Sequence, residues 1–325
     1  MQKELLKERE KGFVSIGSGI SDSYQQIEKS EKITRRCAEI IRDLHYPAKV
    51  MTKSSLIERD IGIWEKVHEN GGFLLTVSLI YPDDKLRKVF EPGASPVKGR
   101  LETIKLFKER GIPVGVYLLP LLPFIADDKR SVEKLLENLK ELQVDYVVTG
   151  TLTLRPGRQK ELYMKTIKDH FPELEVKYKK LYRENRKSGA PLLKYSRAKR
   201  DEMEKLVGEY TFNMEPPHYI YKDKTTLYDE VYVLLNHMIS IYRRENVNVK
   251  PLKETLDTFL KWLKPEIKYM RRRRNLNYRY IENRLVELFE SDKGEEMFPH
   301  YKVRNFLKEV IVNRKTFNYS TLELE

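Results

Sequence analysis

Short apolar runs alternate with amphipathic stretches along the first half of the chain. Five of these runs read as buried strands, at residues 13–18, 48–52, 73–79, 113–119 and 145–150. The stretches between them predict helices at about 31–44, 60–69, 98–110 and 131–142, with Ser131 as the N-cap of the last one. Apolar strands separated by helices are typical of parallel sheets buried on both faces. The pattern therefore predicts an α/β fold, either an open doubly wound sheet or a (β/α) barrel.

The pattern changes after Pro156 and Gly157. From there the periodicity is helical, and it predicts helices at about 158–170, 173–187, 196–209, 225–245, 250–270, 275–291 and 302–313. We therefore expect two parts, an α/β part over residues 1–157 and a mainly helical extension over residues 158–325.

Positive charge and tyrosine are concentrated in the second part. The net charge is +13, with 25 Lys and Arg against 23 Asp and Glu in residues 1–150, and 37 against 26 in residues 151–325. Of the 20 tyrosines, 15 lie in the latter range. A basic, tyrosine-rich surface suits phosphate contacts and base stacking, which favours a nucleic-acid partner. The alternative is a solvated, highly charged surface of the kind that thermophiles use.

Several other classes of function are disfavoured. No Gly-x-Gly-x-x-Gly follows the first strand and no Walker phosphate loop is present, which argues against dinucleotide and nucleoside triphosphate binding. No apolar run approaches the roughly 20 residues of a membrane span, and the first ten residues lack the apolar core of a signal peptide. We therefore expect a cytoplasmic protein without a membrane partner. One cysteine, Cys37, and six scattered histidines predict no metal site.

Polar side chains stand where the predicted strands end. Ser21 and Asp22 follow the first strand, Lys53 follows the second, Ser78 ends the third and Arg155 follows the fifth. The carboxyl ends of parallel strands meet at one side of a sheet, where the sites of such folds lie. Because an unpaired buried charge is costly, Lys53 needs either a ligand or a carboxylate such as Asp22 or Glu58. The hydroxyl of Ser78 can equally satisfy a neighbouring backbone group.

Three segments of the first part resemble one group of radical S-adenosylmethionine proteins. GSGISDSYQQIEKSEKITRR (17–36) is similar to the Gly-Thr-x-Thr-Asp-x-Tyr-Gln-Pro-x-Glu segment of the spore photoproduct lyase-like, or DNA repair photolyase-like, group. VMTKSSLIERDI (50–61) resembles that group's Thr-Lys-Ser strand end followed by Arg-Asp. FEPGASPVKGRLETIKLFKERGIPVGVYLLPLLPFIADD (90–128) resembles its Glu-Pro-x-Ala-Pro, Arg-Leu, Gly-Ile-Pro and Pro-x-x-Pro-x-x-x-Asp series. The match covers about residues 13–160 and implies the TIM-like barrel of radical S-adenosylmethionine proteins.

The resemblance also implies a site for S-adenosylmethionine at the strand ends. In that group, polar residues in these places hold the amino-acid and ribose portions of the cofactor. Carried over to this chain, the cofactor-binding residues are Ser21, Asp22, Lys53 and Ser78, and Asp22 is expected to face the barrel mouth. A lysine ammonium suits the methionyl carboxylate, and a serine hydroxyl suits the ribose or the carboxylate.

The expectations for several further residues are less specific. Tyr24 and Gln25, together with Arg155, are the expected substrate contacts. Glu28 is either a cofactor contact or a structural anion. Glu91 and Arg100 match as well, and an ion pair between them that braces the loop is the simplest interpretation.

This sequence departs from the group at the iron–sulfur cluster. Those proteins bind a 4Fe-4S cluster through a Cys-x-x-x-Cys-x-x-Cys loop after the first barrel strand, before these segments, and here both the strand and the loop are absent. We therefore expect a partial barrel with an open edge beside strand 13–18. Neither a cluster nor radical chemistry is expected of the chain as it stands. It is then a truncated version, half of a split enzyme whose other chain supplies the loop, or a degenerate member kept for binding.

Two basic clusters mark the helical part. Lys199 and Arg200 belong to the run 194–200, and Arg271, Arg272, Arg273 and Arg274 form an uninterrupted run. One interpretation is a phosphate-binding surface with tyrosines that stack on unpaired bases. The other is structural pairing with acids such as Glu282 and Glu287.

Three hypotheses of function follow. The first is a radical S-adenosylmethionine enzyme acting on nucleic acid or a nucleotide-like substrate. The second is a catalytically silent barrel that binds DNA or RNA through its basic helical half. The third is an aldolase-like lyase that uses Lys53 as a Schiff-base amine. The catalytic residues, the product and the oligomeric state do not follow from the sequence.

Overall fold

The computed structural model describes residues 1–17 and 21–325. These residues form two compact units. One unit comprises residues 15–216, and the other comprises residues 217–325 together with residues 1–14. The predicted boundary after residue 157 falls inside the first of these units.

The first unit is built on a parallel sheet of five strands. The strands are β1 (Val14–Ile16), β2 (Ala48–Thr52), β3 (Phe73–Ser78), β4 (Val114–Leu121) and β5 (Tyr146–Thr151). They are neighbours in chain order, as predicted, and β2 to β5 pair in parallel. A doubly wound sheet reverses its strand order at a switch point, whereas this sheet does not. The fold is thus a partial (β/α) barrel whose outer strands, among the described residues, are β1 and β5.

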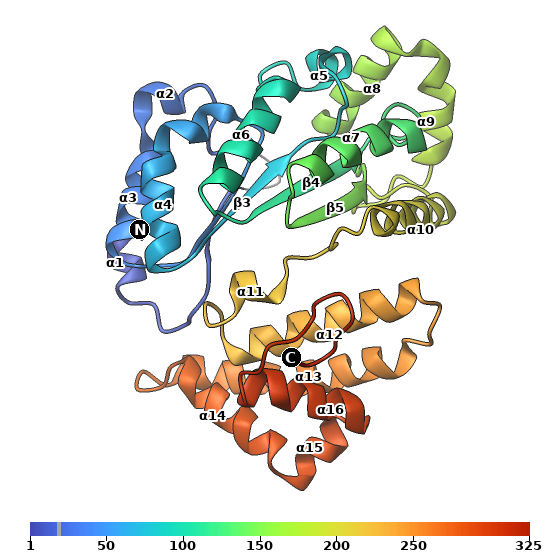
Figure 1. Ribbon diagram of the computed structural model, residues 1–325. Helices are drawn as coiled ribbons and strands as arrows, with labels where there is room; N and C mark the ends of the chain where they lie inside the picture. The colour runs from blue at the N-terminus through green and yellow to red at the C-terminus, as the bar shows by residue number, and fades with distance from the viewer. Residues whose placement is uncertain (18–20) are drawn as a thin grey trace. The chain divides into compact units, whose positions relative to one another are not determined.

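Helices connect the strands, and their apolar faces form the core with the sheet. The principal ones are α3 (Ile33–Asp43), α4 (Ile61–Asn70), α6 (Val97–Glu109) and α7 (Lys129–Glu141), close to their predicted positions. Figure 1 shows α6 and α7 lying along the sheet, and α4 and α6 both contact β3. Trp64 of α4 stacks on Phe73 of β3 with ring centroids 4.5 Å apart. The cap of α7 was predicted wrongly: the carboxylate of Asp128 accepts the Ser131 N–H at 3.0 Å, because the helix begins two residues earlier.

Residues 158–216 pack on the end of this sheet. They contain α8 (Arg158–His170), α9 (Glu175–Leu181) and α10 (Leu193–Glu209). Buried tyrosines of this stretch reach the strand ends: the Tyr178 hydroxyl donates to the Pro123 carbonyl at 2.6 Å and the Tyr182 hydroxyl to the Leu152 carbonyl at 2.8 Å. Because these contacts fix the helices to β4 and β5, this stretch belongs to the barrel unit.

The second unit is a helical bundle. It contains α11 (His218–Tyr221), α12 (Leu227–Arg244), α13 (Lys250–Arg272), α14 (Tyr278–Phe289), α15 (Asp292–Met297) and α16 (Tyr301–Leu307). Leu234, Phe259, Leu285 and Phe298 are among the side chains that form its core. The N-terminal segment belongs to this bundle because the Arg9 guanidinium donates to the carbonyl of Arg273 at 2.6 Å, beyond the last turn of α13. Within the described residues, no helix has the length and apolar character needed to cross a bilayer.

Candidate functional site

A network of charged side chains lies at the carboxyl ends of β2 and β3. Lys53, directly after β2, pairs with one carboxylate oxygen of Glu91, and Arg100 of α6 donates to the other at 2.8 Å. The Lys53 side chain is 35% exposed, whereas the Arg100 residue is only 1% exposed. The pair between Glu91 and Arg100 is as predicted. The partner of Lys53 is not: it is Glu91, because Glu91 is held in place by the buried guanidinium.

Arg100 connects this network to the end of β3. Its guanidinium donates to the Ser78 carbonyl at 2.8 Å and to the Ser95 carbonyl at 2.9 Å. The Ser78 side chain is buried, and its hydroxyl lies 3.5 Å from the Leu119 carbonyl of β4. The ends of β2, β3 and β4 are therefore tied together around one buried arginine, and Ser78 satisfies a backbone group as well as standing at the site.

Asp22 is bound to the start of the loop after β2. Its carboxylate accepts the Lys53 N–H at 2.6 Å, the Thr52 hydroxyl at 2.8 Å and the Tyr24 N–H at 2.8 Å. With three donors around it, Asp22 orders the backbone that presents Lys53. Ser21 is exposed beside it, and residues 18–20 of the same motif lie outside the described part of the chain.

Tyr24 and Glu28 belong to a second, buried polar network. The Tyr24 residue is 1% exposed, and its hydroxyl donates to Asp60 at 3.2 Å and accepts from the Trp64 indole at 2.9 Å. Burial and the nearby Asp60 carboxylate raise the pKa of Tyr24. This enclosed position does not fit the prediction that Tyr24 contacts a substrate.

Glu28 is a structural anion, which resolves the alternatives left open for it. Its carboxylate accepts the backbone N–H groups of Thr34 at 2.9 Å and Arg35 at 3.2 Å, and pairs with Arg59 at 2.9 Å. Burial on its own would raise the pKa of Glu28, but these N–H groups and the guanidinium outweigh it and lower that pKa.

Gln25 and Arg155 are exposed. Among the described residues, neither side chain has a hydrogen bond or an ion pair with Lys53, Glu91 or Arg100. Arg155 lies on the turn between β5 and α8. Of the predicted site residues, the structure thus links Asp22, Lys53 and Ser78 with one another, through Glu91 and Arg100.

The basic cluster around α10 is engaged with its own unit. Lys199 donates to the Asp127 carbonyl at 2.8 Å and pairs with Glu202 at 2.9 Å, and its side chain is largely buried. Arg200 is exposed and pairs with Asp201 at 3.2 Å. Lys199 is therefore unsuited to the phosphate contact predicted for it, because its ammonium is already bound to acceptors within the protein. Asp127 and its partner Tyr195 were missed by sequence reasoning, although the Pro-x-x-Pro-x-x-x-Asp series contains Asp127.

The run of four arginines lies at the end of α13 in the helical unit. Arg271 pairs with Glu10 at 2.8 Å, not with the predicted acids, since the N-terminal segment brings Glu10 there. The Arg273 guanidinium lies 4.7 Å from the centroid of the Tyr269 ring. Arg272 and Arg274 are exposed, and within the described residues neither has an ion pair.

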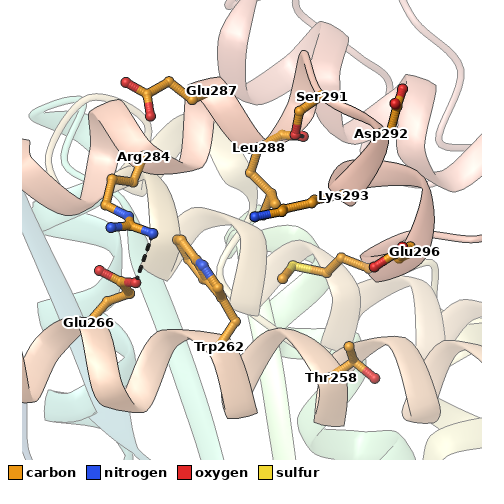
Figure 2. A pocket seen from close by; sticks show the side chains of 11 residues that line it. Thr258, Trp262, Glu266, Arg284, Glu287, Leu288, Ser291, Asp292, Lys293 and Glu296 are labelled. Carbon is orange, nitrogen blue, oxygen red and sulfur yellow. Dashed lines mark hydrogen bonds and ion pairs between the residues drawn. The ribbon is translucent and has the colours of Figure 1, made fainter.

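A hollow of about 700 Å³ lies elsewhere in the helical unit, among α13, α14 and α15. Figure 2 shows Trp262 projecting between α13 and α14, with Glu266 and Arg284 on one side of it and Lys293 on the other. Glu266 and Arg284 pair at 3.3 Å. The hollow contains none of the residues predicted for a site.

The residues present do not fit an iron–sulfur cluster. The sequence holds one cysteine, Cys37, which is a partly exposed free thiol. In the part of the chain that the structure describes, no group of three His, Cys, Asp or Glu is arranged to hold a metal ion. Because the cluster needs several thiolates, no chemical step through it is assigned to this chain.

Comparison with known proteins gives relatives of limited extent. No family model matches the chain. An uncharacterized protein of Mycobacterium tuberculosis is 25% identical over 170 residues, which is 52% of this chain and 49% of that protein. An uncharacterized protein of Methanocaldococcus jannaschii is 28% identical over 173 residues, 52% of this chain and 61% of the relative. The chain thus spans about half the length of the curated relatives it matches.

Solved structures similar to this chain include spore photoproduct lyase. One variant of that enzyme has 15% sequence identity and a TM-score of 0.48, over 64% of this chain and 62% of the lyase. The lyase complexed with a dinucleoside spore photoproduct has 15% identity and a TM-score of 0.46, over 68% of this chain and 62% of the lyase. At these values the function has to be argued from the residues of the site.

Proposed function

We propose that this chain is a barrel protein of the radical S-adenosylmethionine type, related to the spore photoproduct lyase group, that acts on nucleic acid or a nucleotide-like substrate. The observation that carries the proposal is the ion pair between Lys53 and Glu91 at the strand ends. It supports the proposal because an ammonium that already holds a carboxylate there can exchange it for the methionyl carboxylate of the cofactor.

The linkage of the three matching segments gives further support. Asp22 comes from the first segment, Lys53 from the second, and Glu91 and Arg100 from the third, and hydrogen bonds join all four. Residues that match a family only by chance have no reason to meet in one network. Arg100 would keep Glu91 paired when Lys53 turns to a ligand, so the exchange leaves no buried carboxylate without a partner.

When bound beside a cluster, the cofactor supplies radical chemistry in such proteins. The residues of this chain are assigned only to binding and orientation of that cofactor: Lys53 for its carboxylate, and Ser21 and Ser78 for its polar groups. The thiolates of a cluster have to come from outside this sequence, in a preceding segment or a separate chain. Reading the genomic DNA directly upstream for an in-frame Cys-x-x-x-Cys-x-x-Cys tests this requirement.

Calorimetry with S-adenosylmethionine tests the cofactor assignment. Without chelation to a cluster, we expect a Kd in the millimolar range, which corresponds to a favourable binding free energy of about 4 kcal/mol. Lys53→Ala should abolish this binding, while Lys49→Ala, which removes an exposed lysine of β2, should leave it unchanged. Micromolar binding that survives Lys53→Ala, or no binding to the wild type, would contradict the assignment.

The exposed arginines favour a second candidate function, a silent barrel that binds nucleic acid through its helical unit. Arg272 and Arg274 have no ion pair among the described residues, so their charges are available to phosphates. The aldolase-like alternative is less suitable, because a Schiff-base amine has to be uncharged whereas Lys53 pairs with a carboxylate.

A further inference from the structure

Phe124 has an unusual backbone conformation at the exit of β4. Its φ is 65°, in the left-handed region, which costs a bulky residue roughly 1–2 kcal/mol. The residue is also 43% exposed, so the conformation does not serve to bury the ring. Strain of this kind persists only where the surroundings enforce it, and it is frequent at functional sites.

Buried polar groups enforce this conformation. The Phe124 N–H donates to one carboxylate oxygen of Asp127 at 2.8 Å, and the Asp127 residue is 5% exposed. The other oxygen accepts from the Tyr195 hydroxyl, and Lys199 donates to the Asp127 carbonyl at 2.8 Å. Two side chains of α10 thus hold the short loop that presents the ring.

Two aromatic rings support the Phe124 ring itself. Tyr178 packs edge-on against it with centroids 5.8 Å apart, and Tyr195 packs at a tilt at the same distance. Tyr178 is in turn fixed by its hydrogen bond to the Pro123 carbonyl. The Lys177 ammonium lies 5.8 Å from the ring centroid, and in the described part of the chain it has no ion pair. The result is a partly open aromatic ring that packs against two tyrosine rings, with a lysine ammonium over it.

We infer that the Phe124 ring is a stacking platform for a nucleobase of single-stranded nucleic acid, and that Lys177 contacts a phosphate of the same strand. Every base has a flat π-face, and an aromatic ring combined with a cation is how single strands are bound without sequence readout. The platform follows β4, and the end of this strand is joined to Ser78 by the contact with Leu119. The inference rests on the nucleic-acid substrate class of the proposed function and names a residue that would bind it.

Fluorescence anisotropy of labelled oligonucleotides tests the platform in the full chain. The probes are an oligothymidylate of about 12 nucleotides and an abasic oligonucleotide of the same length, at one fixed salt concentration. Phe124→Ala should weaken binding of the oligothymidylate about 5- to 100-fold, as expected for one lost stacking contact, and leave the abasic probe unchanged. Lys177→Gln should weaken both probes, since it removes a phosphate contact.

Phe124→Gly is a second variant that separates loss of the ring from loss of folding, because glycine adopts the left-handed conformation without strain. It should lose the same affinity as Phe124→Ala without a lower melting temperature. The matched control is Leu162→Ala, which removes an exposed apolar side chain of α8. Unchanged affinity of Phe124→Ala and Phe124→Gly would overturn the platform and leave the proposed function standing. Failure of the wild type to bind either probe would overturn both the platform and the nucleic-acid substrate class.

Discussion

Burial separates the structural residues from the exposed ones within the matching segments. Glu28 and Gln25 are three positions apart, yet Glu28 is enclosed by donors whereas Gln25 faces solvent. The Arg59 that pairs with Glu28 comes from the second segment, 31 positions away. A sequence pattern names both partners of such a pair, but only the folded chain brings them together.

Gly115 of β4 offers a prediction at the same scale. A Cβ at this position would lie 2.0 Å from the Tyr146 ring, which cannot move away because it is buried and its hydroxyl bonds to Thr76 at 2.9 Å. Gly115→Ala should therefore lower the free energy of unfolding by about 1–3 kcal/mol, as overpacked core positions do. Gly62→Ala in α4, where an added Cβ meets nothing within 4 Å, is the control and should be neutral or stabilising. Urea unfolding of the two variants gives the comparison, and equal stabilities would contradict the prediction.

The C-terminal tail is an element that the sequence pattern did not predict, since the last predicted helix ends at residue 313. The tail returns along α12: the His237 ring stacks on Tyr319 with centroids 3.6 Å apart, and its Nε2–H donates to the Tyr319 carbonyl at 2.6 Å. Burial, opposed by this hydrogen bond, lowers the pKa of His237 to about 4. The tail is thus held by a neutral imidazole.

This contact makes stability depend on pH. The unfolded chain has the ordinary histidine pKa near 6.5, so between pH 6.5 and 4 it binds more protons than the folded state. The stabilisation that the neutral His237 provides is fully present above pH 6.5. As the pH falls through this window, the free energy of unfolding decreases by up to about 3 kcal/mol. His237→Gln should flatten the fall in unfolding free energy over the window, while His300→Gln, at an exposed histidine of the same unit, should not. The same slope in His237→Gln as in the wild type would refute this account.

The whole molecule consists of two units, and the basic charge is divided between them. Lys199 and Arg200 belong to the unit 15–216, whereas Arg271 to Arg274 belong to the helical unit. In each cluster some cations are spent on neighbouring acids and carbonyls. The candidate phosphate contacts are therefore fewer than the sequence suggests, and they have to be tested one unit at a time.

Arg272 and Arg274 should account for the salt dependence of binding by the helical unit. Replacing both with glutamine removes two phosphate contacts, which should reduce the slope of log Kd against log salt by about 1.4 for a single strand. Arg271→Gln is the matched control and should change the slope little, because Arg271 already pairs with Glu10. Titrations at several salt concentrations provide the slopes. If the double variant keeps the wild-type slope, these arginines do not contact phosphates.

The sequence by itself determined the strands, the helices and their order, because the alternation of apolar runs with helical periodicity is a local property of the chain. It also determined that the ends of β2 and β3 are polar and that too few thiols are present for a cluster. The tertiary structure decided which acid pairs with Lys53, why Tyr24 is enclosed and Phe124 exposed, and where the barrel unit ends. The physical reason is that an ion pair or a buried ring depends on groups tens of residues apart, and their distance is set only when the core packs.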